Sequence, residues 1–289
     1  MVIKPETKKF NYTPRIAAIM IINCKELAKR IKEKAKEEAK GASLSLHTVI
    51  AGGDEASLVY AKSKVRTLKK LNMRGEIHRV DSEKELLDVI EDLNRNEDVH
   101  GIMVEFPLPE GYDAMKVRSA ISPIKDVDGM NPVNYGYLLL GNEILTPNTP
   151  RAVIRILENI TELRGKDVAI INRTPVVGKP LAMMLLNRHA TPTIMHSKTR
   201  NLEEKTRAAD IVVVAVGRPK FLREDMVMEG AIVIDVGINV VGDKIVGDAD
   251  FEEIEKKAKI TPVPGGVGAV TTACMVENLV KAAKLQGVI

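Results

Sequence analysis

Hydrophobic positions along the chain fall into two alternating spacings, which predict strands alternating with helices. Residues 44–51, 76–80 and 101–106 have the length and the hydrophobic positions of strands. Between these runs, residues 23–40 and 56–71 carry the three-to-four-residue spacing of amphipathic helices, and Asn23 with Glu26 forms a capping pattern. An S-x-x-E capping box at Ser82 opens another helix. The alternation predicts a parallel sheet covered by helices.

A second series of the same kind follows an irregular stretch. Residues 126–149 are rich in Gly, Asn and Pro, so we expect an interdomain cleft there rather than a core element. A helix at 151–160 leads into further apolar runs at 168–172, 193–196, 211–215, 231–236 and 260–261. An amphipathic helix over 270–285 ends the chain. Because 289 residues suit two cores of ordinary size, the pattern predicts two α/β domains.

Composition and charge narrow the class of protein. Apolar residues make up 45% and charged residues 28%, as in a soluble globular protein. The net charge of +4 is spread along the chain, and five Tyr, four Phe and no Trp offer few stacking platforms, so nucleic acid is not expected as a partner. The apolar run at 16–22 is too short to span a membrane and no cleavage site follows it. We therefore expect a buried strand there, after a poorly ordered tail of about 15 residues.

Cysteine and histidine usage bears on compartment and metals. Cys24 and Cys274 both lie in apolar-periodic segments, which disfavours a disulfide framework and suits a reducing cytoplasm. The five histidines are scattered, and no His/Cys cluster has the spacing of metal ligands. The sequence therefore predicts a cytoplasmic protein without a metal.

A candidate dinucleotide site follows the strand at 168–172. The turn after it contains Asn172, Arg173, Thr174, Val177 and Gly178 and leads into a helix. Free N–H groups and the dipole at such a helix start attract a pyrophosphate. Only Gly178 matches the last glycine of the usual G-x-G-x-x-G, so an ordinary strand-to-helix turn is an equal alternative.

Further chain turns strengthen the dinucleotide interpretation. Gly217 and Ile238 also follow predicted parallel strands, whose carboxyl ends form the ligand edge of doubly wound sheets. After the second strand of this unit the chain reads His196-Ser197-Lys198-Thr199-Arg200, without the acid that binds the ribose 2′-hydroxyl of NAD. Hydroxyls and cations suit a 2′-phosphate, which indicates NADP. A solvated basic loop is the alternative.

Three residues in the first half share one face of a predicted helix. Ser57, Tyr60 and Lys64 stand three and four residues apart, which places a hydroxyl, a phenol and an amine on one wall. A lysine against an apolar wall can move protons near neutral pH. On spacing alone, a helix face with an extended surface lysine explains the pattern better.

Two other segments are candidates for ligand contact. In 125–129, Asp126 and Asp128 precede a glycine, an arrangement that orients a nitrogenous ring or simply caps a turn. The segment 261–268 contains two prolines and three glycines, which let backbone approach a ligand closely or form a plain structural loop.

Together these segments resemble the bifunctional methylenetetrahydrofolate dehydrogenase/cyclohydrolase family. The resemblance runs from about Ile21 to the C-terminus, in the family's order. It rests on G-D-E-A-S-x-x-Y-x-x-x-K (53–64), G-I-M-V-E-F-P-L-P (101–109), K-D-V-D-G (125–129), G-K-P (178–180), H-S-K-T (196–199), I-D-V-G-I-N (234–239) and T-P-V-P-G-G-V-G (261–268).

The chain departs from the family pattern at several positions. The glutamine before P-L-P is replaced by Glu105-Phe106, which puts an acid where the family has an amide. The family's G-R-S turn is Asn172-Arg173-Thr174, the cysteine of its P-C-T-P segment is Asn148, and its Pro-Met after G-G-V-G is Ala269-Val270. Only the Glu105 change bears on the chemistry, and the Asn148 change argues against a thiol role.

The resemblance implies an enzyme of one-carbon metabolism with a two-domain α/β fold and its active site between the domains. Residues 1–149, rejoined by 266–289, would form the folate-binding catalytic domain, and 150–265 a Rossmann-like, doubly wound NADP-binding domain. The enzyme would oxidise 5,10-methylenetetrahydrofolate to the methenyl cation with NADP, then hydrolyse it to 10-formyltetrahydrofolate. A homodimer through the cofactor domain is also implied.

The resemblance also implies roles for individual residues. Lys64 would be the acid/base, positioned by Tyr60, with Asp128 on the pterin nitrogens and Glu105 beside the lysine. Substrate contacts would come from Ser57, Tyr60, Asp128, Gly268 and Thr271. The cofactor site would consist of Asn172, Arg173, Thr174, Val177, Gly178, Ser197, Thr199, Gly217 and Ile238.

Two alternatives remain at this point. The first is a dehydrogenase with weakened or lost cyclohydrolase activity, since an ionised Glu105 would favour the charged ammonium of Lys64. The same pair can instead share a proton and titrate as a coupled unit, and retention of the other hydrolytic residues favours this. The second alternative is a nucleotide-binding protein without turnover. Retention of Tyr60, Lys64 and Asp128 together argues against it.

Overall fold

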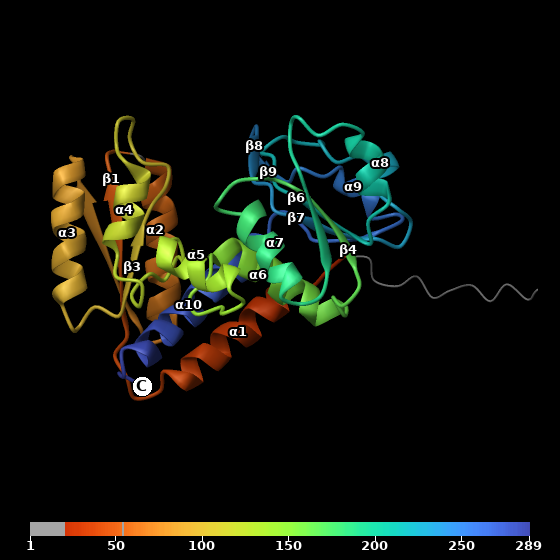
Figure 1. The fold of residues 1–289 in the computed structure, drawn as a ribbon. Helices are drawn as coiled ribbons and strands as arrows, with labels where there is room; N and C mark the ends of the chain where they lie inside the picture. The colour runs from red at the N-terminus through yellow and green to blue at the C-terminus, as the bar shows by residue number, and fades with distance from the viewer. Residues whose placement is uncertain (1–20, 54) are drawn as a thin grey trace, which may run out of the picture.

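The computed structural model describes residues 21–53 and 55–289, which form two α/β lobes joined by long helices (Figure 1). The first half contains a three-stranded parallel sheet in the order β2–β1–β3. Its strands are β1 (Ser45–Ala51), β2 (Arg74–Val80) and β3 (Gly101–Val104), and its helices are α1 (Cys24–Glu38), α2 (Glu55–Lys70), α3 (Glu83–Arg95) and α4 (Ala114–Ala120). The alternation predicted from the sequence is confirmed here.

Local capping fixes where two of these helices begin. Asn23 Oδ1 accepts a hydrogen bond from Glu26 N at 3.2 Å, and Ser82 Oγ accepts one from Glu85 N at 3.1 Å. Each bond satisfies a backbone donor that has no partner within its own helix. Both predicted N-caps are therefore confirmed.

Helices cover both faces of the first sheet. On one face, buried side chains of α3 such as Leu86 and Ile90 pack against β-strand residues including Val49 and Val80. On the other face, Leu46 of β1 packs with Leu68 of α2 and with the C-terminal helix. The carboxyl end of β3 is thereby held next to α2, which carries Lys64.

The second half contains a five-stranded parallel sheet in the order β10–β7–β6–β4–β5. Its strands are β4 (Asp167–Ile171), β5 (Thr191–Met195), β6 (Ile211–Val214), β7 (Ile232–Asp235) and β10 (Lys259–Ile260). Around it lie α6 (Asn148–Ile160), α7 (Gly178–Leu186), α8 (Leu202–Arg207), η1 (Glu224–Met226) and α9 (Phe251–Ile254). The strand order reverses between β4 and β6, and such switch points bind ligands in doubly wound sheets.

The C-terminal helix α10 (Val267–Leu285) joins the two halves. Near its start, Val270 and Cys274 belong to a core that includes α6 and the second sheet, while Met275 and Leu279 belong to the core of the first sheet. Cys274 is a free, buried thiol, and burial raises its pKa to about 12. No disulfide is found in the part of the chain that the structure describes.

Several short elements were not predicted from the sequence, among them α8, η1 and α9. The segment 126–149 contains a helix, α5 (Pro132–Leu139), whose N-cap Asn131 accepts a hydrogen bond from Val133 N at 2.7 Å. The helix is too short for a hydrophobic periodicity to reveal it, because only Asn134 and Leu138 are buried. Helix α4 and the antiparallel hairpin of β8 (Asn239–Val241) and β9 (Lys244–Val246) were also missed. Both are short, and the hairpin is largely exposed.

The predicted strand at 16–22 can be examined only at its end. Residues 1–20, including the expected loose tail, lie outside the described residues. Ile21 pairs with Ile260 in an isolated parallel bridge beside β10, and Ile22 N donates to the Ile260 carbonyl at 3.0 Å. None of the described helices is long and apolar enough to span a membrane.

Candidate active site

Lys64 lies on α2 with its side chain almost fully buried, at 6% exposure. Its Nζ stands 4.5 Å from the centroid of the Tyr60 ring, one helical turn earlier. A cation over the face of a phenol ring is held electrostatically, so Tyr60 fixes where the ammonium points. The predicted shared face of Tyr60 and Lys64 is confirmed.

Glu105 follows β3 and reaches the same amine. Its backbone N donates to the Val49 carbonyl at 3.0 Å, which keeps the residue in line with the sheet. The distance from Lys64 Nζ to Glu105 Oε1 is 2.6 Å, and the side chains are 7% and 10% exposed. The expectation that a carboxylate lies within reach of Lys64 is confirmed, and the contact is a largely buried ion pair.

Two amide side chains in series hold the carboxylate of Asp128 in place. Its Oδ1 accepts from Asn148 Nδ2 at 3.0 Å, and Asn148 Oδ1 in turn accepts from Asn278 Nδ2 at 3.0 Å. Burial raises the pKa of Asp128, while the charge of Lys64 and the bond from Asn148 oppose that rise. Next to it, Gly129 has φ of +67° and sits against the Thr146 backbone, so no larger residue fits this turn.

A cavity of about 280 Å³ brings these groups together between the two halves. Thr271 of α10 lines it, as the sequence predicted for a substrate contact. The wall consists of Tyr60, Lys64, Met103, Val104, Glu105, Phe106, Asp128, Asn148, Thr149, Val176, Thr271, Thr272 and Met275. An amine, two carboxylates and apolar side chains around one cavity are suited to binding a ring and moving a proton.

A second cavity of about 220 Å³ adjoins the first, since Tyr60 lines both. Ile238 and Gly268 lie in its wall, together with the loop that precedes α10. The cleft therefore extends from Lys64 toward the carboxyl edge of the second sheet. Ser57, predicted to contact substrate, is half-buried on α2 and lines neither cavity.

The turn between β4 and α7 is organised by one side chain. Asn172 Oδ1 accepts from Thr174 N at 2.8 Å and from Gly178 N at 3.0 Å, while Asn172 Nδ2 donates to the Ala215 carbonyl at 2.7 Å. A Cβ at position 178 would collide with the Asn172 carbonyl, so the turn requires glycine there. The expected set of free N–H groups is wrong for Thr174 and Gly178, because Asn172 takes them. This turn presents the exposed side chain of Arg173 instead.

The other predicted cofactor residues lie at neighbouring strand ends. After β5, Thr199 Oγ1 accepts from His196 N at 2.9 Å and shapes the loop, and Ser197 is exposed on it. After β6, Gly217 has φ of +67°, and its N donates to Asp248 Oδ2 at 2.9 Å. Val177 is half-buried ahead of α7. The exposed Arg173, Ser197, Lys198 and Arg200 form a basic, hydroxyl-bearing rim suited to a phosphate.

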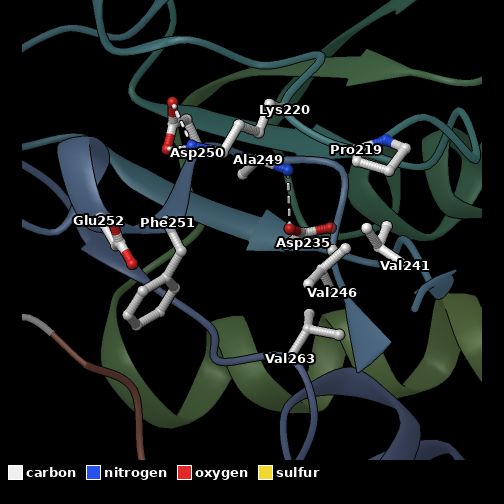
Figure 2. A pocket seen from close by; sticks show the side chains of 11 residues that line it. Pro219, Lys220, Asp235, Val241, Val246, Ala249, Asp250, Phe251, Glu252 and Val263 are labelled. Carbon is white, nitrogen blue, oxygen red and sulfur yellow. Dashed lines mark hydrogen bonds and ion pairs between the residues drawn. The ribbon is translucent and has the colours of Figure 1, made fainter. Parts of the chain in front are cut away.

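A third cavity, of about 380 Å³, lies next to β7, α9 and the hairpin (Figure 2). Asp235 faces it, but its carboxylate is already occupied by N–H donors from Gly237, Asp248 and Ala249, each at 2.9 Å. At the rim, Lys220 pairs with Asp250 at 3.2 Å. These groups hold loops together, so we place the chemistry at the Lys64 cavity.

Two positioning residues escaped sequence reasoning. Asn148 orients Asp128, and Asp248 binds the backbone N–H groups of Val216, Gly217 and Arg218. Both residues are distant in sequence from the groups that they bind, so no local sequence pattern reveals them. The only signal was that Asn148 stands in a Pro-flanked segment next to the predicted cleft.

A hydrogen bond of Tyr135 also crosses between the halves at the cleft. Tyr135 Oη on α5 donates to the Pro175 carbonyl in the β4–α7 turn at 2.5 Å. Burial raises the pKa of this phenol, so it stays a donor at neutral pH. The bond ties the β4–α7 turn to the segment that follows Asp128.

Comparison with known families matches both halves of the chain. Residues 22–128 match the catalytic domain of tetrahydrofolate dehydrogenase/cyclohydrolase, and residues 147–287 match its NAD(P)-binding domain. Together the two matches span most of the 289 residues. They include every element that lines the Lys64 cavity.

Individual relatives cover nearly the whole chain. The bifunctional protein FolD of Caldanaerobacter subterraneus is 46% identical over 271 residues, which is 92% of this chain and 97% of the relative. The crystal structure of the bifunctional methylenetetrahydrofolate dehydrogenase/cyclohydrolase from Campylobacter jejuni has a TM-score of 0.90 and 43% identity, covering 93% of this chain and 100% of that one. The Trypanosoma brucei dehydrogenase-cyclohydrolase, complexed with NADP and an inhibitor, has a TM-score of 0.88 and 34% identity, covering 92% and 98%.

Proposed function

This chain belongs to the tetrahydrofolate dehydrogenase/cyclohydrolase family, and from that premise we propose how its interdomain cleft performs two reactions. The first oxidises 5,10-methylenetetrahydrofolate to 5,10-methenyltetrahydrofolate with NADP. The second hydrolyses the methenyl cation to 10-formyltetrahydrofolate. The observation that carries the proposal is the buried Lys64–Glu105 pair, with Tyr60 and Asp128, in a cavity that opens toward the carboxyl edge of the Rossmann-like sheet.

NADP, when bound, accepts the hydride. The residues present fit it, because the glycine-dependent β4–α7 turn and the basic rim lie at the strand-order switch point. Arg173 and Ser197 would hold the 2′-phosphate, and Asn172, Thr174, Val177, Gly178, Thr199 and Gly217 would shape the loops around the cofactor. Ile238, which is exposed in the adjoining cavity, would cover the nicotinamide end.

Hydrolysis requires a water to add to the methenyl carbon and a proton to leave that water. Lys64 is the amine that lines the cavity, and Glu105 lies 2.6 Å from its Nζ. The pair can take up one proton from the water as the C–O bond forms and give a proton to N5 as the C–N5 bond breaks. The hydroxyl proton of the adduct leaves to solvent as the formyl C=O forms on N10, so one proton is released overall. Water supplies the oxygen, so the step needs no other reactant.

The pterin would be oriented by Asp128 and Tyr60. A carboxylate accepts hydrogen bonds from ring N–H and amino groups, and the Asn148–Asn278 chain keeps that of Asp128 in place. Tyr60 lines both cavities and would stack on the folate ring. Thr271 and Gly268 at the start of α10 would contact the rest of the folate, and Ser57 would support Tyr60 from the preceding turn.

Domain bounds, assembly and location are part of the same proposal. Residues 1–149 with 266–289 would form the folate domain and 150–265 the NADP domain, since α10 packs on the core of the first sheet. A homodimer through the second domain is supported by exposed apolar side chains on its hairpin, such as Val240, Val241 and Ile245. Two buried, unpaired cysteines suit a cytoplasmic protein.

A two-wavelength assay tests the proposal. Purified protein is given 5,10-methylenetetrahydrofolate with NADP or NAD, and formation of reduced cofactor and disappearance of the methenyl absorbance are followed separately. We expect turnover of both steps with NADP. Reduced cofactor with lasting methenyl accumulation would refute the hydrolytic half, and no reduction with either cofactor would refute the whole.

A further inference from the structure

Three donor groups converge on the first sheet, away from the active site. His47 on β1 pairs in register with Glu76 on the edge strand β2, and His78 lies two residues further along β2 on the same face. His47 Nδ1 lies 2.8 Å from His78 Nε2 and 3.9 Å from Glu76 Oε2. Within the described residues, this is the group of three that can share one cation. We propose that it forms a binding site for a borderline divalent cation of the Zn²⁺ type.

The donor set fits that class of ion. Two imidazoles and one carboxylate are common zinc ligands, and hard ions such as Mg²⁺ prefer oxygen donors throughout. Bond lengths of about 2.1 Å in a tetrahedron place donors about 3.4 Å apart. The distances of 2.8 Å and 3.9 Å from His47 Nδ1 to the other two donors lie on either side of that value, so small side-chain rotations bring all three onto one ion. The fourth position would be water, because the side chain of Glu76 is 55% exposed.

The surroundings prepare His47 for this role. Its Nε2 lies 2.9 Å from the buried Ser45 Oγ, and when Nε2 donates there, the lone pair of Nδ1 faces His78 and Glu76. Such a partner on the second ring nitrogen is typical of metal-binding histidines.

Without an ion, the two histidines form an N–H···N hydrogen bond. Their planes differ by 17° and their centroids are 5.1 Å apart, close to the N···N distance plus the two ring radii, so the rings meet edge to edge. A cation would take the place of this bond once the proton on His78 Nε2 has moved to His78 Nδ1, which leaves Nε2 free to bind the ion. No proton is lost overall, and the donors stay in place.

The local charges decide how much Glu76 matters. Arg74 places a positive charge near His47, and His100 would add one when protonated. Glu76 supplies the negative charge near His47. A cation beside Arg74 therefore depends on the carboxylate for neutralisation. The site also lies on the α3 face of the sheet, whereas Lys64 projects from α2 on the other face, so the ion would clamp edge strand β2 to β1 without entering the active site.

The test is a titration of the full chain with Zn²⁺ in competition with a chromophoric chelator at pH 7.5. The wild type should bind one ion per chain at this site. His78→Gln and Glu76→Gln should each weaken that binding by about tenfold or more. Both positions are on the edge strand, so these variants should fold. The matched control is His189→Asn, which removes an exposed histidine with φ of 61° and supplies a residue that tolerates that backbone.

A thermal-melt series gives an independent reading. Zn²⁺ should raise the Tm of the wild type and of His189→Asn, and should leave His78→Gln unchanged, because an ion that binds only the folded state stabilises it. Methenyl hydrolysis by His78→Gln should match the wild type. The proposal is overturned if the wild type binds no stoichiometric ion, or if either Glu76→Gln or His78→Gln binds as tightly as the control.

Discussion

Lys64 Nζ and Glu105 Oε1 are 2.6 Å apart in a nearly closed environment, so the amine and the carboxylate form one buried ion pair. Removing one partner of such a pair leaves the other charge without its counterion, because low exposure leaves little water to solvate it. The family has an amide where this chain has Glu105. Glu105 is therefore the departure from the family pattern that lies in contact with the proposed acid/base.

Glu105→Gln should shift the pH profile of methenyl hydrolysis and affect the dehydrogenase step much less. The substitution removes a negative charge that lies 2.6 Å from Lys64 Nζ, so the electrostatic environment of the amine changes and the profile should move. Both steps are measured from pH 5 to 9 in the two proteins. Glu110→Gln, an exposed change in the loop after β3, is the control. Superimposable hydrolysis profiles would show that Glu105 and Lys64 are electrostatically uncoupled.

Cofactor preference should depend on Arg173. Arg173→Ala should lower kcat/KM for NADP by about tenfold or more and leave that for NAD nearly unchanged, because only NADP carries the 2′-phosphate that the guanidinium would bind. Arg164→Ala provides the comparison, since Arg164 is exposed before β4, at the opposite edge of the sheet. Equal losses with both cofactors, or a wild type that prefers NAD, would place the 2′-phosphate elsewhere.

Asp126 should make folding stability pH-dependent. Burial raises its pKa from 3.8 to about 6, although Asn131 N and Asn134 Nδ2 donate to its Oδ2. A raised carboxyl pKa gives stability that is complete below pH 3.8 and is lost as pH rises through about 6. At about 1.4 kcal/mol per pKa unit, the loss is about 3 kcal/mol.

The measurement compares the wild type with Asp126→Asn in urea at pH 4, 5, 6 and 7. The free energy of unfolding of the wild type should fall relative to the variant as pH rises, whatever the variant's absolute stability. Taking the difference removes the opposite trend of paired acids such as Glu277, whose pKa two arginines lower. A difference that stays constant from pH 4 to 7 would mean that the pKa of Asp126 is not raised in the folded protein.

Sequence periodicity predicted the larger elements because their buried faces are long. The capped starts at Asn23 and Ser82 and the shared face of Tyr60 and Lys64 depend on neighbours three or four residues away, and all three are confirmed. Helix α5 and the β8–β9 hairpin bury too few side chains to leave a readable pattern. Their signals were local instead, such as Pro132 directly after the N-cap Asn131.

Long-range contacts were beyond what sequence spacing can give. Asn148 reaches Asp128 across 20 positions, and His47 meets His78 across 31. The histidines look scattered in the sequence, which is why no metal site was expected from it. Strand pairing between β1 and β2 brings His47 and His78 together, and only the fold supplies that register.

The most direct test of the central claim is Lys64→Met, assayed for both steps. Methenyl hydrolysis should fall by about 10²–10⁴, the usual loss when a general acid–base group is removed, while the protein stays folded and binds NADP with unchanged affinity. Lys62→Met, an exposed lysine on the same helix, should retain full activity. Near-normal hydrolysis by Lys64→Met would remove Lys64 from the mechanism and contradict the account.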